Sequence, residues 1–233
     1  CCMRLRTSSR AAVSWPWADT MVIFDCDGVL VDSERLTHQV VVDMLAERGV
    51  GLSFEEAVDR FIGMSMANGV VQMTALLGGA LPAEFLPEMG RRTRAAFRAG
   101  LTTVPGIEAV LDGLQRPFCV ASNGNHAKVN FTLGHTGLLP RFLNRIFTAD
   151  DVAHPKPAPD LFLLAARTLG ADPARTTVVE DTPTGVTAAK AAGMRAIGFA
   201  AMTPAGRLQA AGADAIARSM AEVAALLAAE GAA

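Results

Sequence analysis

Short apolar runs alternate with helical patterns along most of the chain from Met21 onward. Six runs have the length and composition of buried strands: 21–24, 116–121, 145–148, 176–179, 194–199 and 213–216. Helical patterns lie near 106–115, 125–136, 159–169, 184–192, 204–211 and 219–229. Strands that alternate with helices of about ten residues predict an α/β fold, a Rossmann-like parallel sheet with helices on both faces.

One long stretch interrupts this alternation. Between the first and second strands, residues 34–102 contain helical patterns and no convincing strand. Helices are expected at 34–48, after the N-cap residue Ser53, and near 66–77 and 82–99. A crossover between parallel strands needs only about a dozen residues, so this stretch is predicted to be an inserted all-helical unit.

The predicted domain organisation follows from these patterns. A core is expected over 21–34 and 103–233, and the helical insertion over 35–102. Residues 1–20 contain three arginines, several Ser and Thr residues and no acid before Asp19. We interpret them as an extension in front of the domain.

Composition and charge exclude several classes of protein. Of the 233 residues, 51% are hydrophobic and 19% are charged, and the net charge is -2. This balance argues against a nucleic-acid partner, which requires a clustered basic excess. Charged residues interrupt every apolar stretch, so no membrane span is expected. The four cysteines form no disulfide framework, and a cytoplasmic protein with reduced thiols is expected.

Polar side chains follow three of the predicted strands directly, which is the main functional signal of the sequence. These residues are Asp25 and Asp27, then Ser122 and Asn123, then Glu180 and Asp181. Ligands of open parallel sheets bind at the carboxyl ends of the strands, so the three groups are expected to meet. The alternative for each group is local: solvated turn acids, an N-cap, or acids that stabilise a helix dipole.

The residue types at these strand ends indicate phosphate and metal chemistry. If the chain turns at Gly28, Asp25 can attack a substrate while Asp27 handles protons. The segment 122–124, with Gly124 before a helix, offers donors to phosphate or carboxylate. The acids at 180–181, facing Asp25, suit an oxygen-ligated Mg²⁺. Lys156 lies between prolines, which fix its position.

Four segments together resemble the motifs of the haloacid dehalogenase-like superfamily. They are 24–34, 121–124, 156–162 and 179–186, they occur in the order of the family, and the resemblance covers roughly 21–229. Within the superfamily, the sequence resembles the β-phosphoglucomutase and sugar-phosphate phosphatase branch, and most of all its 6-phosphogluconate phosphatases.

The resemblance implies a role for each motif residue. Asp25 would be the nucleophile that forms an aspartyl phosphate, and Asp27 the general acid and base. Mg²⁺ would be held by the Asp25 carboxylate, the Asp27 carbonyl and Asp181, with Glu180 in support. Phosphoryl oxygens would be held by Ser122, Lys156 and the backbone near Asn123 and Gly124.

The inserted helices resemble the helical cap of this superfamily, which closes over the substrate. The segment 60–66 resembles the cap loop that reaches into the site. Arg60, Gly63 and Ser65 are therefore the candidate residues for contacts with the leaving group.

Alternative functions remain open at this point. A phosphosugar mutase is disfavoured because Thr37 replaces an expected histidine, and because Ile62 and Met66 replace cationic residues that would hold a second phosphate. A catalytically silent binding module is also disfavoured, since all the motif residues are present. We expect a phosphatase for a small phosphate ester, without nucleic-acid or membrane partners, as a monomer or weak homodimer.

Overall fold

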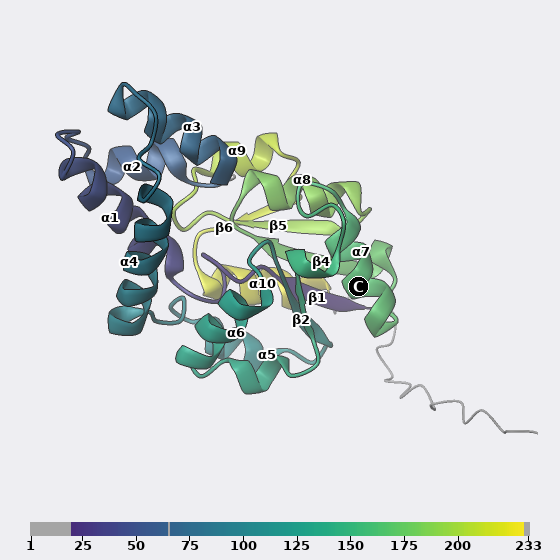
Figure 1. The fold of residues 1–233 in the computed structure, drawn as a ribbon. Helices are drawn as coiled ribbons and strands as arrows, with labels where there is room; N and C mark the ends of the chain where they lie inside the picture. Colours follow the sequence, from purple (N-terminus) through teal and green to yellow (C-terminus); the bar gives the residue numbers. More distant parts are fainter. Residues whose placement is uncertain (1–19, 65, 231–233) are drawn as a thin grey trace, which may run out of the picture.

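The computed structural model describes residues 20–64 and 66–230 (Figure 1). Apart from Thr20, the predicted extension over 1–20 lies outside the described residues. The predicted cap residue Ser65 also lies outside them.

Six parallel strands form a single sheet at the centre of the molecule. Their order is β3 (Ile146–Thr148), β2 (Phe118–Ser122), β1 (Met21–Phe24), β4 (Thr176–Glu180), β5 (Arg195–Phe199) and β6 (Ala215–Ala217), and all five pairings are parallel. The predicted α/β class is thus confirmed. Because β1 lies between β2 and β4, the polar residues that follow these strands meet at one edge of the sheet.

Two layers of helices cover the sheet (Figure 1). One layer contains α5 (Ile107–Gly113), α6 (His126–His135) and α10 (Met220–Glu230), and the other contains α7 (Asp160–Leu169), α8 (Pro183–Ala191) and α9 (Ala205–Ala210). The alternation of side chains along β1 supplies both layers. Val22 and Phe24 pack with the first, and Met21 and Ile23 with the second.

The part of the chain between β1 and α5 is helical, as predicted, and lies to one side of the sheet (Figure 1). It contains α1 (Ser33–Ala46), α2 (Phe54–Phe61), α3 (Met66–Leu77) and α4 (Phe85–Gly100). These helices have a hydrophobic cluster of their own, centred on residues such as Met44, Leu45 and Phe85. At Ser53, a capping box with Glu56 fixes the start of α2.

The chain leaves the sheet and returns to it at one place. The backbone N–H of Asp32 donates to the carbonyl of Thr102 at 3.0 Å, and that of Val104 to the carbonyl of Leu30 at 3.0 Å. The two connections therefore run side by side.

In the described ranges, no helix has the length and apolar character that crossing a bilayer demands.

Candidate active site

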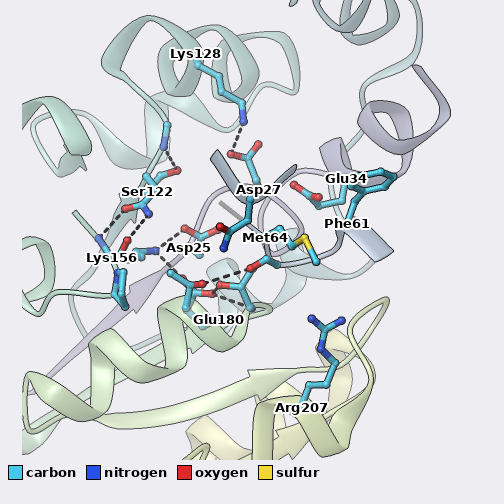
Figure 2. Close-up of a pocket in the computed structure, with 17 residues that line it drawn as sticks. Asp25, Asp27, Glu34, Phe61, Met64, Ser122, Lys128, Lys156, Glu180 and Arg207 are labelled. Carbon is cyan, nitrogen blue, oxygen red and sulfur yellow. Dashed lines mark hydrogen bonds and ion pairs between the residues drawn. The ribbon is translucent and has the colours of Figure 1, made fainter. Parts of the chain in front are cut away.

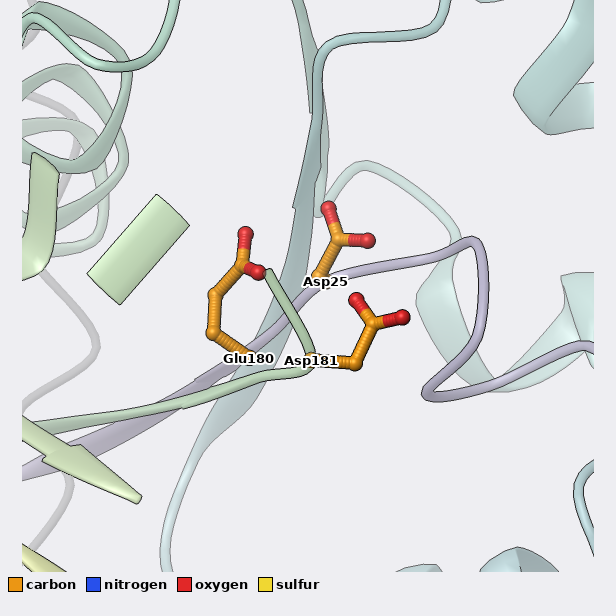
Figure 3. A group of neighbouring side chains, drawn as sticks. All are labelled: Asp25, Glu180 and Asp181. Atoms are coloured by element: carbon orange, nitrogen blue, oxygen red, sulfur yellow. The ribbon is translucent and has the colours of Figure 1, made fainter. Parts of the chain in front are cut away.

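Three buried carboxylates meet at the carboxyl ends of β1 and β4 (Figure 3). Asp25 directly follows β1, Glu180 is the last residue of β4, and Asp181 comes next. One carboxylate oxygen from each lies within 4.8 Å of the others. The pairing of β1 with β4 produces this cluster, because it aligns the ends of the two strands.

The ammonium of Lys156 links two of these acids. Its Nζ lies 2.7 Å from Oδ1 of Asp25 and 2.6 Å from Oε1 of Glu180 (Figure 2). It also donates to the carbonyl of Ala121 at 2.8 Å. The side-chain amide of Asn123 holds the backbone of Lys156 through two hydrogen bonds of 3.0 Å, one accepted and one donated. Asn123 thus positions Lys156.

Asp27 faces the same cavity, and each of its carboxylate oxygens accepts a hydrogen bond. Oδ1 accepts from the Ser33 hydroxyl at 2.6 Å, and Oδ2 accepts from Nζ of Lys128 at 2.7 Å. Burial would raise the pKa of Asp27, but Lys128 and Ser33 outweigh that effect and hold the pKa below its usual value. The carboxylate is therefore ionised in this arrangement.

Ser122 ends β2 beside the acids and is 1% exposed. Its Oγ accepts the backbone N–H of Gly124 at 3.1 Å, which leaves the hydroxyl proton available as a donor. The backbone N–H of Gly124 is already hydrogen-bonded to Ser122, so Gly124 stabilises the turn after β2.

The acid cluster is electrostatically uncompensated. Burial raises the pKa of Asp25 to about 7, although the nearby Lys156 lowers it. For Asp181, burial together with the charges of Glu180 and Asp25 raises the pKa well above its usual value. One ammonium does not balance three buried carboxylates, so a further cation would stabilise this cluster.

The free oxygens of the cluster fit a divalent cation. Oδ1 of Asp181 is buried and has no hydrogen-bond partner among the described residues, and Oδ2 of Asp25 likewise receives none there. Both oxygens of Glu180 are already used, by Lys156 and by the amide and hydroxyl of Thr182. Hard carboxylate oxygens without donors are typical ligands of Mg²⁺, so Asp25 and Asp181 are the better candidates for direct ligands.

Gly28 makes room for this arrangement. Its φ is +75°, and a Cβ at this position would lie 2.1 Å from Oδ2 of Asp181. The turn that the sequence predicts at Gly28 is therefore present, and a side chain there would displace Asp181.

A cavity of about 630 Å³ opens above these groups and is lined from both regions of the molecule (Figure 2). The strand ends and the helices and loops around the sheet supply Asp25, Asp27, Ser122, Lys128, Lys156, Glu180 and Arg207. The start of α1 supplies Glu34, and the end of α2, the loop after it and α3 supply Phe61, Gly63, Met64 and Asn68. Gly63 has a φ of +69°, and its Cβ position lies 3.0 Å from Cδ of Pro183. The loop after α2 thus rests closely on the start of α8.

Arg60 is the predicted residue that the structure does not bring to the site. It lies on the exposed side of α2 and is not among the described residues that line the cavity. Its place in the cap loop suggested a contact with the leaving group, but α2 directs this position outward.

Lys128, Glu34 and Arg207 line the cavity but were not predicted as site residues. Lys128 lies in the first turn of α6, where a cation opposes the helix dipole; that mismatch is a signal in the sequence. Glu34 carries no such signal, because an acid in the first turn of a helix is favourable. Arg207 lies in a short helix far from every motif, and nothing in the sequence marks it.

Comparison with known proteins agrees with this geometry. Residues 20–193 match the family model of the haloacid dehalogenase-like hydrolases. The chain is 32% identical over 182 residues to the 6-phosphogluconate phosphatase of Escherichia coli, with 77% of this chain and 82% of that protein covered.

Two of the solved structures that are similar to this chain cover about nine tenths of it. A conserved haloacid dehalogenase-like protein of unknown function from Agrobacterium tumefaciens has a TM-score of 0.85 and 36% identity, covering 91% of this chain and 99% of that one. A HAD family hydrolase from Deinococcus radiodurans, solved with bound phosphate and sodium, has a TM-score of 0.79 and 32% identity, covering 92% and 97%. The chain therefore belongs to the haloacid dehalogenase-like hydrolase family.

Proposed function

We propose that the protein is a Mg²⁺-dependent phosphatase that hydrolyses a small phosphate monoester through an aspartyl phosphate on Asp25. The observation that carries the proposal is the position of Lys156, whose ammonium joins Asp25 and Glu180 beside the unpartnered oxygen of Asp181. Phosphoryl transfer depends mainly on positioning and electrostatic stabilisation, and this cluster offers both.

Asp25 is the proposed nucleophile. One of its two carboxylate oxygens would attack phosphorus while the other contributes to the metal site, and the hydrogen bond from Lys156 to Oδ1 orients the carboxylate for both roles. Ser122 and Lys156 are the proposed donors to the phosphoryl oxygens, because both lie next to Asp25 on the floor of the cavity. Asn123 contributes indirectly by fixing the backbone of Lys156.

Asp27 is the proposed general acid and base. Its ionised form suits the second half of the reaction, in which it accepts a proton from the water that attacks the aspartyl phosphate. The first half requires a proton for the departing alcohol. Phosphate monoesters have a second pKa of about 6, so a bound monoanion can bring this proton and pass it to Asp27.

The proposed metal site consists of Asp25, Asp181 and the backbone carbonyl of Asp27, with Glu180 in support. A bound Mg²⁺ would supply Lewis-acid neutralisation of the charge shared by the carboxylate nucleophile and the phosphoryl group. Burial, together with the neighbouring acids, raises the pKa values of Asp25 and Asp181, so a bound cation would favour the ionised forms that the site requires.

We further propose that residues 35–102 act as a cap on a core of 21–34 and 103–233. The paired connections beside Leu30 and Thr102, and the separate hydrophobic cluster of the helices, support this division. Closure of the loop after α2 over the cavity would exclude bulk water from the aspartyl phosphate.

The proposed substrate class is a sugar phosphate or a phosphorylated sugar acid. The similarity to a 6-phosphogluconate phosphatase supports this choice, as does the size of the cavity, which suits a small molecule.

Hydrolysis of p-nitrophenyl phosphate tests the mechanism. We expect turnover with Mg²⁺, loss of turnover in EDTA, and loss in Asp25→Asn, while Asp59→Asn, at an exposed position away from the cavity, remains active. Activity that survives both EDTA and Asp25→Asn would refute the mechanism.

The mutase alternative needs its own test. Ile62 and Met66 offer no charge to a second phosphate, but Arg207 is a further cation in the cavity. With β-glucose 1-phosphate as substrate, we expect free phosphate. Formation of glucose 6-phosphate would identify a mutase instead.

A further inference from the structure

Among the residues that the structure describes, one cationic side chain of the cavity has no acidic partner. Three cations line it, and two of them are paired: Lys156 with Asp25 and Glu180, and Lys128 with Asp27. Arg207 forms no ion pair with any residue that the structure describes. Its Nη2 donates a hydrogen bond to the carbonyl of Ile62 at 3.4 Å, at the long end of the range for such bonds.

This guanidinium retains most of its binding capacity. An arginine offers five N–H donors in a rigid plane, and a single long hydrogen bond uses only one of them. The side chain is half-buried, so it is partly desolvated without any compensating charge. An anion that entered the cavity would therefore find a donor group that nothing else in the described structure neutralises.

The position of Arg207 is fixed by the fold. It lies on α9, whose next residue, Leu208, is 0% exposed and packs in the same hydrophobic cluster as α7 and α8. Figure 2 shows Arg207 apart from the linked side chains of Lys156, Asp25 and Glu180, directed toward the region of Met64. It thus faces the part of the cavity left for the leaving group when a phosphoryl group lies at Asp25.

We propose that Arg207 binds a second anionic group on the leaving group and makes the enzyme selective for phosphate esters that carry one. This inference rests on the proposed phosphatase function and names the substrate class of the same site. A carboxylate is the favoured group, because its single charge and its two oxygens match one guanidinium. A second phosphate would carry up to two negative charges. Among the described residues, Arg207 is the one unpaired cation at that end of the cavity, so a second phosphate would be only partly neutralised.

Two six-carbon esters that differ at the far end test the proposal. 6-Phosphogluconate ends in a carboxylate, and glucitol 6-phosphate ends in a neutral hydroxymethyl group. For the unmodified enzyme we expect kcat/KM for 6-phosphogluconate to exceed that for glucitol 6-phosphate by roughly tenfold to a hundredfold, the value of one charge-assisted hydrogen-bonded pair. Equal values would overturn the proposal even if no variant were made.

Variants assign this selectivity to a residue. Arg207→Gln should lose the preference for 6-phosphogluconate, mainly through a higher KM, and should change turnover of glucitol 6-phosphate by less than about threefold. Arg207→Lys should keep part of the preference. Arg167→Gln, at an exposed position on α7, is the matched control and should behave as the unmodified enzyme. Equal losses for both substrates in Arg207→Gln would overturn the proposal.

A third ester distinguishes the two anions. If the enzyme prefers glucitol 1,6-bisphosphate to 6-phosphogluconate and this preference depends on Arg207, then Arg207 binds a second phosphate and the proposal of a carboxylate is wrong. The failure of this inference is separate from that of the proposed function. Equal hydrolysis of charged and neutral esters contradicts only the role of Arg207, whereas absence of hydrolysis of any ester, p-nitrophenyl phosphate included, contradicts both.

Discussion

The ammonium of Lys128 lies 2.7 Å from Oδ2 of Asp27, although the two residues are 101 positions apart. The contact joins the first turn of α6 to the loop after β1. Together with the hydrogen bond from Ser33 to the other oxygen, it fixes the orientation of the Asp27 carboxylate. Lys128 is therefore a positioning residue for the proposed general acid and base.

Replacing Lys128 with methionine should lower kcat for p-nitrophenyl phosphate by roughly tenfold, part of the 10²–10⁴-fold that general acid–base catalysis contributes. The reason is that Asp27 would lose one of its two fixed contacts while its carboxyl group remains. Lys128→Arg should restore most of the rate, because it keeps the cation. Steady-state kinetics measure both variants.

The matched control is Lys190→Met, which breaks a surface pair with Asp214 of similar length, 2.7–2.8 Å. It should leave kcat unchanged. An Lys128→Met enzyme as active as Lys190→Met would show that the contact has no part in catalysis.

Asp181 gives a prediction about stability. Its carboxylate is buried beside two others, and its Oδ1 lacks a partner among the described residues. In EDTA, Asp181→Asn should therefore raise Tm by a few degrees, because burial and the neighbouring acids raise the pKa of Asp181 well above its unfolded value, and the amide removes this cost of folding. Mg²⁺ at about 100 times its Kd should stabilise the unmodified protein by about 2.7 kcal/mol, or roughly 5–10 °C for a chain of this size.

In Asp181→Asn, Mg²⁺ should no longer raise Tm. Thermal unfolding with and without Mg²⁺ measures both effects, with Asp59→Asn as the control that keeps the shift. A lower Tm for Asp181→Asn in EDTA, or an unchanged response to Mg²⁺, would contradict the assignment of Asp181 as a ligand.

The sequence predicts the strands and the motif residues well because both depend on local pattern. A buried parallel strand is a short apolar run, and its end is marked where polar residues begin, as at Asp25 and Glu180. The boundaries differ by about two residues; for example, β2 begins at Phe118, after Pro117, and ends at Ser122 rather than Ala121. Strand order could not be derived from these patterns, because it depends on how successive crossovers pack.

The residues that were missed lie on helices rather than at strand ends. Whether Arg60 points inward or Lys128 points toward Asp27 depends on the rotation of each helix about its axis, which packing against the rest of the protein decides. Arg207 shows the limit most clearly, because α9, which carries it, belongs to none of the four motifs. Only the assembled fold brings it to the cavity.

His38 predicts how stability depends on pH. The ring is 3% exposed, and burial lowers its pKa below the ordinary value of 6.5. The unfolded chain therefore binds more protons than the native protein just below pH 6.5. The contribution of His38 is fully present above this pH and is lost as the pH falls.

Urea unfolding at pH 7.5 and pH 5.5 tests this sign. The loss of unfolding free energy on acidification should be smaller in His38→Gln than in the unmodified protein. Glu34, whose pKa burial raises to about 7, acts in the opposite direction, and its carboxylate lies 3.7 Å from the His38 ring. The comparison is therefore repeated in a Glu34→Gln background, which removes the titration of Glu34. An identical or larger loss in His38→Gln would contradict the prediction.

Gly28 and Gly49 separate backbone strain from a clash in the site. Both have a positive φ, +75° and +81°, so alanine at either position should cost about 1–2 kcal/mol of unfolding free energy. At Gly49 nothing lies within 4 Å of the added Cβ, whereas at Gly28 the Cβ would meet the Asp181 carboxylate at 2.1 Å. Gly28→Ala should therefore lower the unfolding free energy by more than Gly49→Ala does. It should also lose Mg²⁺ affinity and activity, which Gly49→Ala should keep.

Urea unfolding and calorimetric titration with Mg²⁺ measure these effects. Equal Mg²⁺ affinity of the two variants would contradict the proposal that Asp181 is a metal ligand and needs the space that Gly28 provides.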